Sequence, residues 1–81
     1  MTTEQKLEAL AEAAQAATDA GHASAAIRWW NTAYRVRTLL AEAAEMAREA
    51  DLNEYGRRTY FAGEATRLGA EARRLLDEVA T

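Results

Sequence analysis

The stretch that decides the fold runs from Ala23 to Ala50 and reads ASAAIRWWNTAYRVRTLLAEAAEMAREA. It contains neither Gly nor Pro, the two residues that most strongly disfavour a helix interior. Its apolar residues spread over more than half of a helical wheel, which is wider than one neighbouring helix can cover. We therefore predict a long central helix over residues 23–50, with the two flanking segments packed around it.

The apolar arc of this central helix is expected to face both neighbours. Its members are Ala26, Ile27, Trp30, Ala33, Tyr34, Val36, Leu40, Ala41, Ala44 and Ala47. We expect Trp30 and Tyr34 in the core and Trp29 at an edge. Arg37 and Arg48 fall inside the arc rather than on the polar strip opposite it. Either they extend to solvent or pair with carboxylates of a neighbouring helix, or they contact acidic groups of a partner.

The segment before the central helix carries clear start and stop signals, which predict a helix over residues 3–20. Thr2 and Gln5 fit a capping box, and Gly21 fits the left-handed residue just past a helix end. Ser24 is the expected cap of the central helix. An acidic stripe, expected to face solvent, comprises Glu8, Glu12, Gln15 and Asp19.

The segment after Ala50 is expected to form a third helix over residues 52–80, capped by Asp51 and Glu54. Apolar residues recur along it at alternating spacings of four and three. This seam comprises Phe61, Ala65, Leu68, Ala72, Leu75 and Val79. Such a repeat is typical of a helix that packs nearly parallel to another helix.

Small residues recur every seven positions on the opposite face of this third helix, at Gly56, Gly63 and Ala70, beside Tyr60 and Arg67. A mid-helix Gly destabilises by roughly 1 kcal/mol relative to Ala, so such a row is a poor choice for an ordinary surface. The row either lets a partner helix or strand approach closely, or it reflects tight internal packing or neutral drift.

Length and composition indicate one small helical domain over residues 1–81, about a quarter of it alanine. The net charge of −3 argues against a general binder of nucleic acid or anionic membranes. The chain has no cysteine, and residues 1–4 precede no apolar signal core, so we expect a cytoplasmic protein without a secretory peptide. No apolar run approaches the roughly 20 residues of a membrane helix.

The residues that carry catalysis are mostly missing, and we predict no enzymatic activity, no cofactor and no metal site. His22 is the only histidine, so the Glu-x-x-His pairs of helical di-metal sites cannot form. Ser24 lacks a base with an orienting group. A cluster of cations and aromatics on the third helix leaves nucleic-acid binding as an alternative. Its cations are Arg57, Arg58, Arg67, Arg73 and Arg74.

The junction of the first two helices resembles a tetratricopeptide-repeat hairpin. Gly21, Ala26, Trp30 and Ala33 occupy the positions of its Gly, Ala, aromatic and second Ala. Thr38 stands where the repeat has its closing Pro, so the second helix is free to continue. No second copy of the pattern follows, which excludes a repeat array.

A single hairpin of this kind, extended into a three-helix bundle, is similar to microtubule-interacting-and-transport (MIT) domains. The matching segments are Ala26-Ile27-Arg28-Trp29-Trp30 and the set Phe61, Ala65 and Leu68. The resemblance implies that a helical or extended peptide binds in a groove beside the third helix. It would place near that site Val36, Leu40, Ala43, Ala47, Tyr60, Gly63 and Arg67.

We therefore predict an all-α antiparallel three-helix bundle whose long second and third helices project beyond the first, near Leu39 to Tyr60. The leading hypothesis is a non-enzymatic protein-interaction module that binds a helical or extended peptide of a partner. The alternatives are a self-assembling homodimer and a small nucleic-acid binder. The residues predicted to contact the partner are Arg37, Leu40, Ala47, Arg48, Tyr55, Gly56, Tyr60, Gly63 and Arg67.

Overall fold

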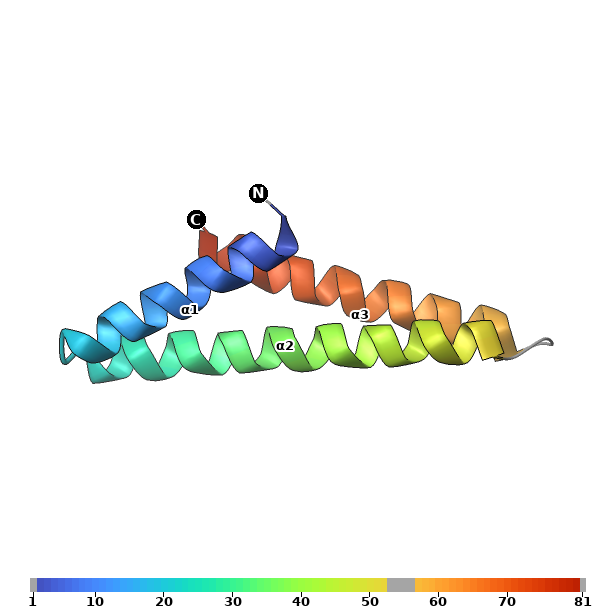
Figure 1. Ribbon diagram of the computed structural model, residues 1–81, viewed down its shortest axis with the longest axis horizontal. Helices are drawn as coiled ribbons and strands as arrows, with labels where there is room; N and C mark the ends of the chain where they lie inside the picture. Colours follow the sequence, from blue (N-terminus) through green and yellow to red (C-terminus); the bar gives the residue numbers. More distant parts are fainter. Residues whose placement is uncertain (1, 53–56, 81) are drawn as a thin grey trace.

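The computed structural model describes residues 2–52 and 57–80, which form three helices. These are α1 (Thr3–Asp19), α2 (Ala23–Leu52) and α3 (Arg57–Ala80). Helix α3 returns alongside α2 for most of its length, whereas α1 crosses from the start of α2 towards the end of α3 (Figure 1). The predicted all-α fold, three helices with a long α2–α3 hairpin, is confirmed.

Both ends of α1 follow the local signals in the sequence. At its start, the Gln5 backbone N–H donates to the Thr2 hydroxyl at 3.1 Å, and the Thr2 N–H donates to the Gln5 side-chain oxygen at 2.8 Å. At its end, Gly21 takes a left-handed conformation with φ of 77°. The His22 N–H then donates to the Ala17 carbonyl at 2.9 Å, as in a Schellman motif. The predicted capping box and glycine stop are confirmed.

The start of α2 differs from its predicted cap. The Ala26 N–H donates to the His22 carbonyl at 2.9 Å, which is the first hydrogen bond of the helix. His22 therefore occupies the cap position, and Ser24 lies inside the first turn. The prediction that Ser24 caps α2 is wrong, because the Schellman motif already brings the chain into helical geometry at Ala23.

The far end of α2 also differs from its prediction. The helix continues to Leu52, so Asp51 lies in its last turn instead of capping α3. The predicted partner of that cap, Glu54, lies outside the described residues. Helix α3 begins at Arg57 rather than at residue 52. Because no Gly or Pro interrupts residues 41–52, the good helix formers there extend α2 past its predicted end.

The core is small and lies where all three helices meet. Its buried cluster consists of Leu10 from α1, Ala33 and Val36 from α2, and Ala72 and Leu76 from α3. Packed against that cluster are Leu7, Trp29, Leu39, Leu40 and Leu75. The alanines let the helix axes approach closely, since small side chains at ordinary spacing would leave voids.

The heptad seam of α3 is largely confirmed. Leu68 and Ala72 are buried, while Phe61 and Ala65 are half-buried. The side chain of Val79 lies outside the part of the chain that the structure describes.

The three helices differ greatly in length, with 17, 30 and 24 residues in chain order. At 1.5 Å per residue, α2 is about 45 Å long and α1 only about 26 Å. The start of α1 is tied to the end of α3 by an ion pair of 2.7 Å between Lys6 Nζ and Asp77 Oδ1. The other end of the α2–α3 hairpin consequently projects past α1, as Figure 1 shows.

Candidate interaction surface

Three large apolar side chains lie together on the outward side of α2. Ile27, Trp30 and Tyr34 are 62%, 40% and 74% exposed, and their spacing of three and four residues puts them on one face of the helix. The prediction that Trp30 and Tyr34 belong to the core is therefore wrong. Leu52, which is 71% exposed, lies on the same face at the far end of α2.

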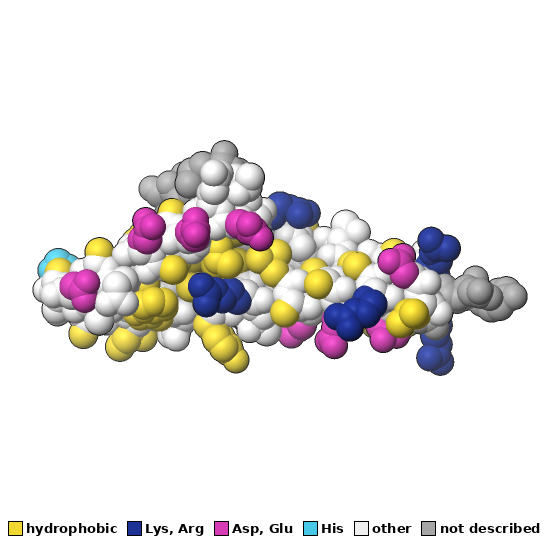
Figure 2. Space-filling model, viewed as in Figure 1, with side chains coloured by type: hydrophobic (Ala, Val, Ile, Leu, Met, Phe, Trp, Pro, Cys, Tyr) yellow, Lys and Arg dark blue, Asp and Glu magenta, His cyan; other side chains and the backbone are white. Residues whose placement is uncertain are grey.

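Ile27, Trp30 and Tyr34 belong to a longer pattern, which we call the α2 stripe. Its spacing alternates between three and four residues over about six helical turns, and every member is exposed. Its members are Ile27, Trp30, Tyr34, Arg37, Ala41, Ala44 and Arg48. Figure 2 shows hydrophobic side chains gathered along α2 below α1, with basic side chains between them.

The apolar arc of α2 is divided because α1 and α3 do not lie on opposite sides of it. One part of the arc, represented by Ala33 and Val36, faces the other two helices and is buried. Trp29 shares that side, since it precedes Ala33 by four residues and Val36 by seven, and its half-buried ring packs against the core cluster. The α2 stripe is the part of the arc that remains exposed.

Trp30 is exposed, yet it is held in place. Its indole Nε1–H donates to the Thr18 hydroxyl of α1 at 3.1 Å, and that hydroxyl donates to the Ala14 carbonyl at 2.9 Å. The one polar group of the ring is thus satisfied within the chain while much of the apolar ring faces outward. Such a side chain can contact a partner without a large loss of rotamer freedom on binding.

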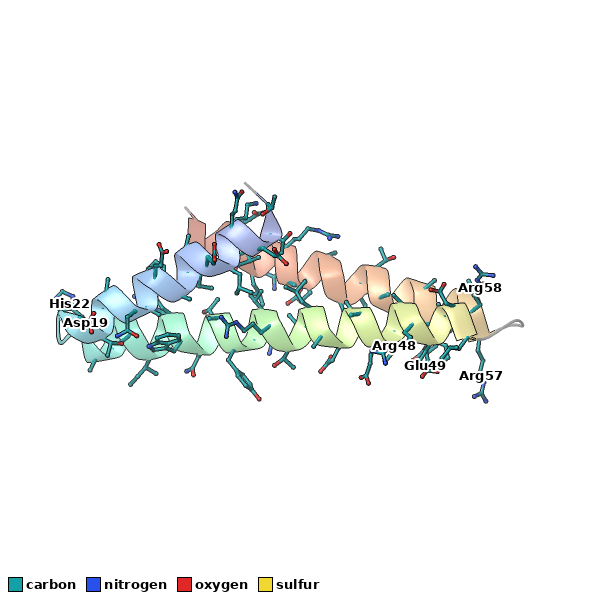
Figure 3. The ribbon with its side chains drawn as sticks, in the orientation of Figure 1. Asp19, His22, Arg48, Glu49, Arg57 and Arg58 are labelled. Atoms are coloured by element: carbon teal, nitrogen blue, oxygen red, sulfur yellow. The ribbon has the colours of Figure 1, made fainter. Side chains whose placement is uncertain are left out.

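Arg37 and Arg48 belong to the α2 stripe, and both are exposed. Neither forms an ion pair with a residue that the structure describes, so the predicted pairing with a neighbouring helix is not observed there. Figure 3 places Arg48 at the projecting end of the hairpin, near Glu49, Arg57 and Arg58.

The other predicted contact residues on α2 differ in exposure. Leu40 is half-buried and packs against the core cluster. Val36, which the MIT resemblance would place near the site, is fully buried. Ala47 is exposed on the projecting half of α2.

The predicted contact residues on α3 lie on another side of the molecule. Tyr60, Gly63 and Arg67 are exposed on the face of α3 opposite its buried seam, and the structure does not bring them next to the α2 stripe. A Cβ built on Gly63 meets nothing within 4 Å, so tight internal packing does not explain that glycine. Tyr55 and Gly56 lie outside the described residues.

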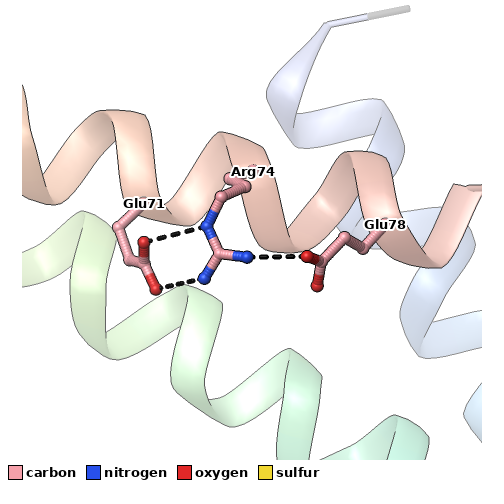
Figure 4. Close-up of polar contacts among 3 residues, drawn as sticks. All are labelled: Glu71, Arg74 and Glu78. Carbon is pink, nitrogen blue, oxygen red and sulfur yellow. Dashed lines mark hydrogen bonds and ion pairs between the residues drawn. The ribbon is translucent and has the colours of Figure 1, made fainter.

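Two arginines of α3 are held by carboxylates of their own helix. Arg67 pairs with Glu64 at 2.7 Å. Arg74 bridges Glu71 and Glu78, each at 2.6 Å, as Figure 4 shows. The hydrogen bond from each arginine lowers the pKa of its carboxylate partner, Glu64 or Glu71. These pairs neutralise part of the basic surface on which the nucleic-acid alternative depends.

The two halves of α2 carry opposite charge. Residues 23–38 hold three arginines and no acidic residue, which gives +3. Residues 39–52 hold four acidic residues and one arginine, which gives −3. All eight side chains are exposed, namely Arg28, Arg35, Arg37, Glu42, Glu45, Arg48, Glu49 and Asp51. Near the boundary, Tyr34 of the α2 stripe and Arg35 and Glu42 of the polar strip line one shallow hollow.

Neither a metal site nor a membrane-spanning helix is found among residues 2–52 and 57–80. No three His, Asp or Glu side chains there are placed to hold a metal ion. No helix in the same ranges is long and apolar enough to cross a membrane. Comparison of the chain with protein-family models, with curated proteins and with solved structures finds no match.

Proposed function

We propose that this protein is a non-enzymatic protein-interaction module, and that it binds a helix of its partner along the α2 stripe. The observation that carries the proposal is the exposure of Ile27, Trp30 and Tyr34 together on one face of α2. Burying a fully exposed side chain of this size contributes about 1.5–3 kcal/mol. A partner that covers the exposed parts of these three side chains therefore supplies a useful share of a binding free energy. Trp, Tyr and Arg are also the residues that most often dominate binding at protein interfaces.

The spacing of the α2 stripe favours a helical partner over an extended peptide. Side chains at alternating intervals of three and four residues match the seam of a second helix packed nearly parallel. Ala41 and Ala44 in the middle of the stripe allow that helix axis to come close. An extended peptide, in contrast, gains most from the free backbone edge of a sheet, and the described residues form no strand.

Site-specific photocrosslinking in the native host tests the proposal. A benzoylphenylalanine replaces Tyr34 in the stripe, and in a control variant it replaces Thr66, which is exposed on α3. We expect a covalent adduct with the variant at position 34 and none of the same mass with the control. Adducts at neither position, or identical adducts at both, would overturn the proposal.

A substitution on α3 separates the α2 stripe from the small-residue face. Gly63→Leu adds a bulky side chain where a Cβ meets nothing within 4 Å, so the fold should tolerate it. If the partner binds the α2 stripe, the adduct at position 34 persists in this variant. If the adduct disappears, α3 is part of the contact surface and the proposal is wrong in its placement.

A further inference from the structure

Carboxylates border the first half of the α2 stripe. Trp30 donates a hydrogen bond to Thr18, so the side of α1 that carries Thr18 lies beside the stripe. Glu8 and Glu4 precede Thr18 by steps of three and four residues, which puts them on the same side of α1, and both are exposed. Figure 2 shows acidic side chains along α1, above the hydrophobic side chains of α2. A partner helix on the stripe therefore has carboxylates beside it there.

Carboxylates also border the second half of the stripe, where α2 projects past α1. Glu45 precedes Arg48 by three residues and Asp51 follows it by three, so they lie on opposite sides of the stripe. Both are exposed, and neither forms an ion pair with a residue that the structure describes. Arg57 and Arg58 lie farther out, at the end of the hairpin (Figure 3).

The cations of α1 and α2 that lie outside the stripe face other parts of the molecule. Arg35 lies close enough to Glu71 of α3 to interact with it electrostatically. Arg28 is on the same side of α2 as Arg35, because seven residues separate them. Lys6 of α1 pairs with Asp77 of α3 at 2.7 Å. None of these three cations borders the stripe, so its carboxylates are not neutralised by them.

We infer that the partner helix is basic along both edges, and that it is an amphipathic helix of another protein whose apolar seam is flanked by Lys or Arg. This inference rests on the proposed function, because it gives the chemistry of the helix that the α2 stripe binds. Side chains that flank the seam of a helix pair are the ones whose charges select the partner. A second copy of this chain does not meet the requirement through its own stripe, because carboxylates would then border both helices.

The two arginines within the stripe add a condition on the seam of the partner. Arg37 and Arg48 are eleven residues, or about three turns, apart. A cation of the partner opposite either arginine would be unfavourable, so the partner carries a small or hydrogen-bond-accepting side chain there. Two such positions at the same separation fix the register of the pair, as a polar residue does in the seam of a coiled coil.

Two synthetic helical peptides of about 25 residues, long enough to span the stripe, provide the test. They share one seam of leucine and alanine and differ only along the edges, which carry Lys in one peptide and Glu in the other. Fluorescence anisotropy of each labelled peptide with the wild-type chain measures its dissociation constant. We expect the Lys peptide to bind at least about tenfold more tightly in about 0.05 M salt, and this preference to shrink in about 0.5 M salt.

Charge reversal on the chain assigns the preference to the borders of the stripe. Glu8→Lys and Glu45→Lys should each weaken binding of the Lys peptide by at least about threefold. Glu78→Lys is the matched control, because it makes the same change of charge at an exposed position of α3, and it should leave that affinity unchanged. Circular dichroism of each variant confirms that it is folded.

Equal affinity for the two peptides, or binding of neither at about 0.2 mM, would overturn the inference. A loss of affinity in Glu78→Lys as large as in Glu45→Lys would also overturn it, because the preference would then follow net charge alone. Any of these results together with a covalent adduct at position 34 leaves the proposed function standing. Absence of that adduct ends both, since the inference rests on the proposed function.

Discussion

Replacing Leu76 by Ala is expected to lower the free energy of unfolding by about 3 kcal/mol. Leu76 is 3% exposed and packs in the cluster that joins the three helices. The substitution removes three carbon groups, each worth about 0.8 kcal/mol of burial, and leaves a cavity that adds to the loss. The short α1 can move partly into this cavity. The expected loss of unfolding free energy therefore lies towards the lower end of the range of about 2–5 kcal/mol for such substitutions.

That loss is large for this chain. At roughly 0.05–0.15 kcal/mol per residue, 81 residues give a total stability of about 4–12 kcal/mol. For a domain of this size 1 kcal/mol shifts the thermal midpoint by about 4–8 °C, so the Leu76→Ala midpoint should fall by about 12–24 °C. Thermal and urea unfolding followed by far-ultraviolet circular dichroism measure the change.

Ile27→Ala is the matched control, because it also shortens an aliphatic side chain on a helix. Ile27 is 62% exposed, so only a minor part of its surface is removed from water in the single chain. Ala is the better helix former, which offsets most of that small loss, and we expect a change below about 0.5 kcal/mol. Equal losses for the two variants in dilute solution would refute the assignment of Ile27 to the surface and of Leu76 to the core.

Two glycines and one arginine give the remaining predictions. Gly21→Ala should destabilise by about 1–2 kcal/mol, because φ at this position is 77°, whereas Gly63→Ala should stabilise by about 0.5–1 kcal/mol inside a helix with open space around it. Thermal unfolding of the two glycine variants, measured in parallel, tests both expectations. Shifts of the thermal midpoint with the same sign in both variants would contradict the reasoning. Arg74→Met should reduce the loss of folding stability that occurs as the pH falls from neutral into the acidic range. Arg74 lowers the folded-state pKa of Glu71, so this stabilisation exists above the unfolded pKa and is lost as pH falls through the lowered value. Thermal midpoints of the wild type and of Arg74→Met, measured between neutral pH and about pH 3, test this prediction. The same change of midpoint with pH in both proteins would contradict it.

The parts of the fold that local chemistry determines could be predicted from the sequence. The capping box of Thr2 with Gln5 and the stop at Gly21 need only a few neighbouring residues, and both are present as expected. The cap proposed at Asp51 failed because an acidic residue three positions before another also fits inside a helix. No backbone-breaking residue near Asp51 distinguished the two cases.

The orientation of α2 could not be predicted from a helical wheel. A wheel shows that Trp29, Ala33 and Val36 share one face and that Trp30 and Tyr34 share another, but it does not say where the neighbouring helices stand. A usable signal was nevertheless present. The face of Trp30 also carries Arg37 and Arg48, and a buried face rarely holds two cations without partners. Those arginines indicated the outward side.

The exposed side chains of α2 have a consequence for the whole chain. A protein of this length buries only about two-thirds or less of the surface that its unfolded chain exposes, so its hydrophobic core is small. Only four large apolar side chains are buried among the described residues, namely Leu10, Val36, Leu68 and Leu76. Keeping Ile27, Trp30 and Tyr34 outside therefore weakens an already small core, unless an association buries them. A partner that covers the α2 stripe buries these side chains, so its binding would also stabilise the fold by mass action. Trp30 is the clearest case, because its indole is fixed by a hydrogen bond to Thr18 while 40% of the residue remains exposed to water.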